Sequence, residues 1–157
     1  MKVAKWNPSA QSIAVDARPR SMTVSSIPPT PADGTSARIT DDEAEALART
    51  TVNLFAKWGL NDSEARILLG DMPTSTWANW KRGQFGDIPH DRRSRMALLM
   101  GIHKGLRYLF REPERGYAWI CKPNSAFGGA SALDVMMRGE TVELVQVRDY
   151  LAAERGL

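Results

Sequence analysis

The sequence predicts an all-α protein that follows an N-terminal arm, and two observations support this. Beyond about residue 40, apolar residues recur at helical spacing in segments separated by capping residues and glycines. Residues 1–38 instead contain five of the nine prolines and almost no aliphatic periodicity. Such a segment cannot bury enough apolar surface to offset its ordering entropy. We therefore expect residues 1–38 to be a disordered, flexible Pro/Ser-rich arm.

The bulk composition is that of an ordinary soluble protein. The chain has 157 residues, of which 43% are hydrophobic and 25% are charged. We expect no membrane segment and a cytoplasmic location, because no apolar run approaches the roughly 20 residues of a membrane helix and no secretory signal is apparent. Cys121 is the only cysteine, and with two histidines it cannot complete a Cys/His zinc site. We expect no metal, no cofactor and, since no nucleophile has a nearby base, no enzymatic activity.

Three helices are predicted between residues 40 and 83, each with a capping residue and a terminal glycine. The cap candidates and glycines are Thr40 or Asp41 with Gly59, Asn61 or Asp62 with Gly70, and Thr74 or Ser75 with Gly83. The second and third helices are short and joined by a tight turn, which is typical of a helix-turn-helix. We expect a DNA-binding region over residues 39–88, with Trp77 and Trp80 as packing residues because they lie three apart on one face.

A local excess of cations supports a polyanionic partner for this region. Residues 74–111 contain eight Lys and Arg against two Asp. The third helix would lie in the major groove, and the basic helix that follows could reach phosphates. The predicted DNA contacts are Ser75, Thr76, Asn79, Lys81, Arg82, Arg92 and Arg93. A helical hairpin whose charges are merely solvated remains the alternative.

The second half of the chain is also predicted to be helical. A long basic connecting helix is expected over residues 89–111, and a short helix over 112–121. A loop follows at 124–129, after which Ser131 and Asp134 have the spacing of a capping box. The last helix, over about 140–153, carries more apolar surface than one stripe needs. Some of that surface should meet a partner, either a second copy of the chain or another protein.

The order of these segments resembles the Xre/MbcA/ParS family of bacterial antitoxins. The resemblance covers about residues 40–157 and is most specific in the pattern W-x-x-x-P-N-x-x-F-G-G-x-S-A-L-D, followed by R-D-Y-L. The residues that carry it are Glu64 to Gly70, Ser75 to Gly83, Trp119, Pro123, Asn124, Phe127 to Gly129, Ala132 to Asp134, Gly139, and Arg148 to Leu151.

The resemblance implies an antitoxin of a type II toxin-antitoxin system. Such a protein would bind a RES-domain toxin, which consumes NAD or transfers ADP-ribose, and block its active site. As a homodimer it would also bind promoter DNA and repress its own operon. The toxin-binding domain would span residues 112–157. The implied toxin-binding residues are Trp119, Asn124, Phe127, Gly128, Gly129, Leu133, Tyr150, Leu151, Arg155 and Leu157.

Two alternatives remain open at this point. Part of the motif is also explained by structure alone, with Gly128 and Gly129 as a turn that needs positive φ, and Trp119 and Phe127 as core residues. The whole chain is also compatible with a stand-alone helix-turn-helix transcription regulator whose C-terminal half dimerises or binds a ligand. If the antitoxin interpretation is correct, deletion after Gly139 should abolish toxin neutralisation and leave DNA binding intact.

Overall fold

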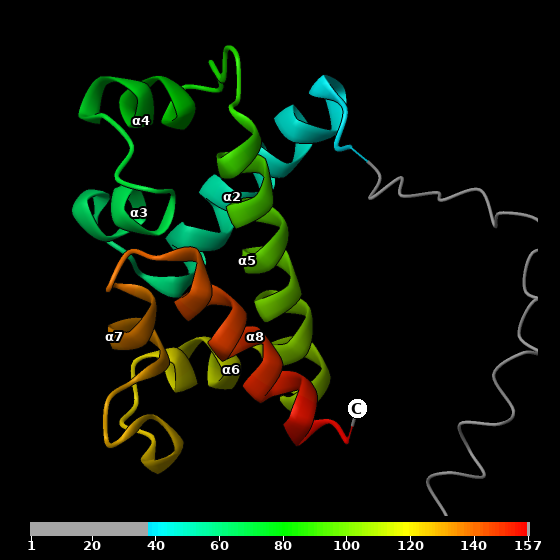
Figure 1. Ribbon diagram of the computed structural model, residues 1–157, viewed down its shortest axis with the longest axis vertical. Coiled ribbons are helices and arrows are strands. Elements are labelled where there is room, and N and C mark those ends of the chain that lie inside the picture. Colours follow the sequence, from blue (N-terminus) through cyan, green and yellow to red (C-terminus); the bar gives the residue numbers. More distant parts are fainter. Residues whose placement is uncertain (1–37, 157) are drawn as a thin grey trace, which may run out of the picture. The chain divides into compact units, whose positions relative to one another are not determined.

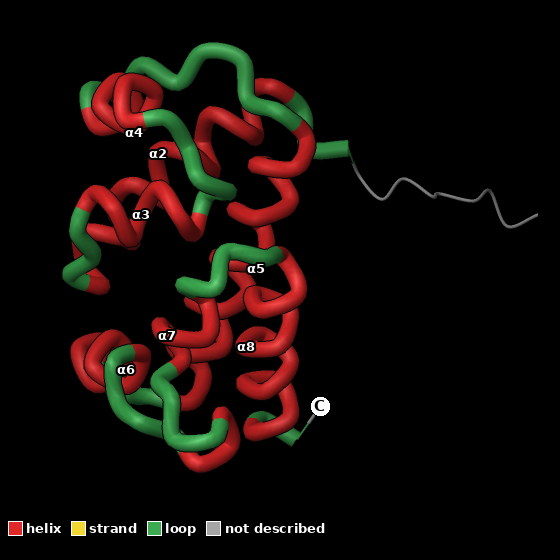
Figure 2. Tube along the Cα trace, turned by 60° about the vertical axis from the view of Figure 1, so that its left-hand side comes forward, coloured by secondary structure: helices red, strands yellow, loops and turns green. Residues whose placement is uncertain are grey.

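The computed structural model describes residues 38–156, so the predicted arm at 1–38 lies outside the described residues except for Arg38, and so does Leu157. Within the described range the chain is helical and forms no strand, which confirms the all-α prediction (Figures 1 and 2). The elements are α2 (Asp41–Trp58), α3 (Asp62–Leu68), α4 (Thr74–Lys81), α5 (His90–Leu109), α6 (Pro113–Ile120), the 3-10 helix η2 (Ser125–Phe127), α7 (Ala132–Met136) and α8 (Thr141–Glu154).

Three helices begin with a complete capping box, of which the sequence predicted the one at Ser131 and gave Thr40 and Asn61 as cap candidates. Thr40, Asn61 and Ser131 each accept a hydrogen bond from the backbone N–H three residues later, and the acidic side chain at that position accepts one in return. The prediction for α4 was wrong. Pro73, not Thr74 or Ser75, occupies its N-cap position, and no side chain caps the helix. Proline fixes its own φ near the value that this position needs, so Thr74 is already the first helical residue.

Helix α5 is the central element of the fold and packs against α2, α6 and α8. In both views α8 lies alongside α5 (Figures 1 and 2). The buried side chains of α8 are Leu144, Val147 and Leu151. A Cβ built on Gly105 would lie only 3.0 Å from the Cβ of Leu151, so the missing side chain permits this close approach.

The packing of α8 bears on the expectation that deletion after Gly139 leaves the rest of the chain able to bind DNA. From Ile39 onward the chain is one compact unit, and its buried apolar residues form one hydrophobic core cluster. Deletion of α8 would remove three fully buried residues of that core and uncover one side of α5. Loss of neutralisation by such a truncated chain would therefore not identify a toxin contact.

Aromatic residues fill the core between α2 and α4. Trp77 and Trp80 are buried, which confirms their predicted packing role. The Trp77 ring lies 6.1 Å from that of Phe55, and the Trp80 ring packs edge-on against Phe85 at 5.6 Å. Trp77 Nε1 also donates a 2.9 Å hydrogen bond to Asp62. This bond ties α4 to α3 and fixes which face of α4 remains exposed.

No helix in the described range is long and apolar enough to cross a membrane.

Candidate functional site

Four aromatic side chains come together on the C-terminal half of the domain. Trp119 from α6 and Tyr150 from α8 stack with their centroids 5.9 Å apart and their planes 7° from parallel. Phe127 from η2 packs edge-on against Tyr150 at 5.0 Å, and Phe110 lies 6.4 Å from Trp119. We call this set the aromatic cluster. It unites three of the predicted toxin-binding residues with Phe110, which was not predicted.

The loop between α6 and α7 is held closed by its own hydrogen bonds. Pro123 and Ser131 form an isolated bridge, and Asn124 N–H donates to the Ala130 carbonyl at 3.0 Å. The Asn124 side chain accepts from the Ala126 N–H at 2.9 Å, so its oxygen shapes the loop. Gly128 and Gly129 have φ of 67° and 89°, as a turn that needs glycine requires. Both glycines are exposed, and Phe127, which precedes them, belongs to the aromatic cluster.

Other predicted contact residues differ in their exposure. Leu133 and Tyr150 are half-buried, and the Arg155 guanidinium lies 3.8 Å from the centroid of the Tyr108 ring. Leu151 is only 1% exposed and packs beside Gly105. The structure thus places Leu151 in the core, where its side chain has almost no surface for a partner to contact.

Two exposed apolar residues at the end of α5 were missed by sequence reasoning. Tyr108 is 70% exposed and Leu109 is 36% exposed. Together with Arg155 they form what we call the C-terminal patch. Tyr108 lies off the periodic stripe of α5, which is a signal of exposure, but the sequence does not show that Arg155 lies over its ring. Such an aromatic and Arg pair is typical of interface hot spots.

The predicted DNA contacts on α4 lie mostly on its exposed face. Helices α3 and α4 are joined by residues 69–73, and a 2.6 Å hydrogen bond from Arg66 Nε to the Met72 carbonyl links the two ends of this turn. Ser75, Asn79, Lys81 and Arg82 are exposed and Thr76 is half-buried. Two of the cations have partners within the chain, since Lys81 Nζ donates to Asp62 and Arg82 donates to Asn79, both at 2.8 Å.

The cations at the start of α5 have internal partners. Arg93 donates to the carbonyls of Ile88 and Ile39 at 2.8 and 2.6 Å and to Asp41 at 2.6 Å, and its side chain is only 15% exposed. Arg92 Nε donates to the Leu69 carbonyl at 3.2 Å, and burial lowers the pKa of its guanidinium. These bonds join α5 to the start of α2 and to the turn after α3. They give both arginines a structural role that the sequence did not show.

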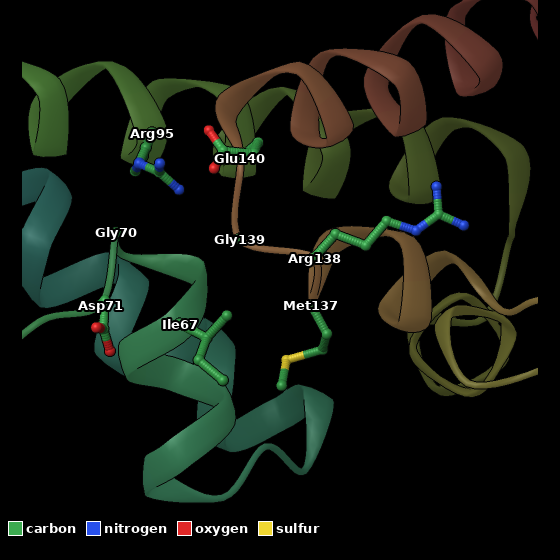
Figure 3. A pocket seen from close by; sticks show the side chains of 8 residues that line it. All are labelled: Ile67, Gly70, Asp71, Arg95, Met137, Arg138, Gly139 and Glu140. Atoms are coloured by element: carbon green, nitrogen blue, oxygen red, sulfur yellow. The ribbon is translucent and has the colours of Figure 1, made fainter.

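A groove of about 510 Å³ separates the turn after α3 from the link between α7 and α8 (Figure 3). Arg95 points into it, and its Nε donates to Asp91 at 3.2 Å. None of the predicted DNA-binding or toxin-binding residues lines this groove; its walls are Ile67, Gly70, Asp71, Arg95, Met137, Arg138, Gly139 and Glu140. Among the described residues, no group of His, Cys, Asp or Glu is arranged to hold a metal ion.

These features define a small helical binding protein, with one exposed polar helix in its first half and an aromatic and apolar surface in its second. Residues 105–156 match the Antitoxin Xre/MbcA/ParS C-terminal toxin-binding domain. The chain is also 40% identical over 114 residues to the uncharacterized protein y4oB of Sinorhizobium fredii (strain NBRC 101917 / NGR234). The aligned region covers 73% of this chain and 84% of that protein. The C-terminal third of the chain therefore contains a toxin-binding domain of the Xre/MbcA/ParS type. No solved structure matches the chain.

Proposed function

We propose that the protein neutralises a RES-domain toxin, an enzyme that consumes NAD or transfers ADP-ribose, by covering its active site. We further propose that it represses its own operon by binding promoter DNA as a dimer. The toxin partner follows from the match of residues 105–156 to a toxin-binding domain. The observation that carries the finer proposal is that this segment exposes Tyr108 and Leu109, with the Arg155 guanidinium over the Tyr108 ring.

The contact surface is proposed to centre on the C-terminal patch. Tyr108 and Leu109 expose apolar area that makes no contribution to the core, so its burial against the toxin would be favourable without any change in the fold. Arg155, held over Tyr108, supplies a guanidinium that can pair with a carboxylate of the toxin. The loop glycines and Leu133 would extend this surface, while Trp119, Phe127 and Tyr150 would hold it in shape. No catalysis by the antitoxin is required.

The toxin half of the proposal is tested with the product of the adjacent gene. The toxin's NAD consumption is titrated with the full-length protein, and a sharp endpoint at a fixed ratio is expected for stoichiometric inhibition. Tyr108→Ala should weaken binding about 30-fold, the equivalent of a hot spot of roughly 2 kcal/mol. Val142→Ala is the matched control, because Val142 is 67% exposed at the opposite end of α8.

The outcomes separate the surface from the partner. If Tyr108→Ala and Arg155→Ala both bind as tightly as the wild type, the C-terminal patch is not the interface. If the purified complex leaves NAD consumption unchanged, occlusion of the active site is refuted even though binding persists.

The DNA half of the proposal rests on the exposed face of α4. The fixed packing of Trp77 and Trp80 leaves Ser75, Asn79 and Arg82 on the outside of a helix that follows a tight turn. An Asn side chain can pair with the edge of adenine, and Ser and Arg can bind phosphates or base edges. We therefore propose Asn79 as the base-reading residue, with the other exposed residues positioning the helix.

Promoter binding is measured by titration of labelled operon DNA at several salt concentrations. Asn79→Ala should cost about 1–3 kcal/mol on the cognate site and little on random DNA. Arg82→Gln should weaken binding to both the cognate site and random DNA, and should reduce the slope of log affinity against log salt concentration by about one. Arg111→Gln, an exposed cation outside α4, is the matched control. Equal loss on cognate and random DNA for Asn79→Ala would reject the base-reading role, and sedimentation of the DNA complex would report whether a dimer binds.

A further inference from the structure

A second pocket, distinct from both proposed surfaces, opens where α2, α5 and α6 meet. It has a volume of about 480 Å³ and is lined by Lys57, His103, Arg107, Pro113, Glu114 and Tyr117. His103 and Arg107 are one turn apart on α5, Lys57 comes from the end of α2, and the other three come from the start of α6. The volume lies within the range of roughly 300–1,000 Å³ that is usual for small-molecule sites.

The charges that line this pocket are unbalanced. Lys57 and Arg107 are the basic residues of the lining, and neither forms a salt bridge with any residue in the described part of the chain. Glu114 is the single acidic residue in the lining, and it also makes no salt bridge within that range. Pro113 and Glu114 belong to the first turn of α6, which has no side-chain cap and adds the positive end of a helix dipole. The pocket therefore presents a net positive potential.

His103 contributes a polar atom that has no partner among the described residues. Its Nδ1 is buried without a hydrogen bond, while its ring stacks on Tyr117 at 6.1 Å. Buried polar atoms are normally satisfied, so an orphan of this kind points to a missing partner. Burial, Arg107 and Lys57 all lower the pKa of His103 below its ordinary 6.5. An anion placed among these groups would accept a hydrogen bond from the imidazolium and offset the repulsion.

We propose that this pocket binds the oxyanion group of a small molecule, a phosphate or a carboxylate, between Lys57, Arg107 and His103. Lys57 and Arg107 supply charge-assisted hydrogen bonds from two different helices. His103 becomes protonated as the anion enters, so binding takes up a proton when the pH lies above the pKa of His103. Tyr117 orients the imidazole through their stacked rings.

The pocket is lined by residues from two different parts of the chain. Lys57 belongs to the helix that packs on α4, whereas Arg107 and α6 lie inside residues 105–156, which match the toxin-binding domain. A bound oxyanion would cross-link these parts of the molecule without touching α4 or the C-terminal patch. The ligand would therefore stabilise the domain and couple its two halves.

The test follows the two histidines of the full-length protein by NMR of their imidazole carbons and nitrogens. His90 is exposed at the start of α5 and serves as an internal reference, because the chain has only two histidines. Inorganic phosphate, acetate and adenosine 5′-monophosphate are titrated separately, with chloride at matched ionic strength. We expect the oxyanion to raise the pKa of His103 and to leave that of His90 at its value in chloride.

Substitutions then assign the cations. Lys57→Gln and Arg107→Gln should each weaken binding about tenfold, as for the loss of one charge-assisted hydrogen bond. Lys104→Gln, an exposed cation on α5 that does not line the pocket, should change it less than about twofold. The proposal is overturned if the two histidines respond equally, if neither responds to any of the three probes, or if the Gln variants bind like the wild type.

The responses to the three probes identify the chemical class of the ligand, and the proposed site is the same in each case. A response to phosphate and not to acetate assigns a phosphate group, whereas equal responses assign oxyanions in general. Tighter binding of the nucleotide than of phosphate assigns a phosphorylated metabolite. Each of these results supports the proposal, and none depends on toxin or promoter binding.

Discussion

Replacement of Leu151 by alanine distinguishes a core residue from a toxin contact. The resemblance suggested direct contact, but Leu151 is 1% exposed and lies against α5 beside Gly105. Truncation of a fully buried leucine removes its transfer free energy and leaves a cavity, at a cost of about 2–5 kcal/mol. A domain of this size has a total stability of about 5–15 kcal/mol, so the loss is a large fraction. The melting temperature should fall by roughly 8–20 °C.

The assay is thermal and denaturant unfolding of the full-length chain, compared with toxin binding at a temperature where the variant is folded. Val142→Ala on the same helix provides the control, because a residue that is 67% exposed should change stability by no more than about 0.5 kcal/mol. Once folded, Leu151→Ala should bind the toxin nearly as tightly as the wild type. An unchanged melting temperature combined with lost toxin binding would refute the packing of α8 described above.

Three further predictions concern the polar contacts and the loop. Arg93→Gln should lower the free energy of unfolding by about 1–3 kcal/mol, because three hydrogen bonds are lost. If the variant instead keeps its stability and loses promoter affinity, Arg93 is a phosphate contact. Hydrogen bonds from Lys81 and Trp77 lower the pKa of Asp62 in the folded state. The Asp62 carboxylate therefore stabilises the fold above its ordinary pKa of 3.8, and this stabilisation is lost as the pH falls through the lower folded-state pKa. Asp62→Asn should reduce this loss of stability at acid pH in unfolding titrations, and an unaltered pH profile would contradict the prediction. Gly128→Ala should destabilise the domain by about 1 kcal/mol because its φ of 67° disfavours a side chain, and a higher melting temperature would show that the turn differs from this description.

Features that depend on neighbouring residues could be predicted from the sequence. The caps of α2, α3 and α7 follow from side chains three residues apart, and the packing of Trp77 and Trp80 follows from helical spacing. The error at the start of α4 is also local: Thr74 or Ser75 was expected as the N-cap, but Pro73 occupies this position without a side-chain cap. Local rules therefore gave the helices and their order with small shifts at the ends.

Features that depend on distant residues could not be predicted in this way. Arg93 was assigned to phosphate from its charge, but its partners Ile39 and Asp41 lie more than 50 positions earlier in the chain. The last helix showed more apolar residues than one stripe needs, and periodicity cannot tell which of them meets α5. Leu151 was therefore assigned to the contact surface from the resemblance alone, and Tyr108, which the structure exposes, was not assigned to it.

The central position of α5 limits how related proteins can exchange parts. One side of this helix completes the core beneath α2, and another receives α8. In a hybrid of two related proteins, a recombination point within or beside α5 would combine α5 from one protein with α2 or α8 from the other. Hybrid chains should therefore fold when they inherit α5 together with α8, or when they carry compensating changes at positions such as Gly105. Because α5 packs against both α2 and α8, a substitution that remodels one of these contacts must preserve the other.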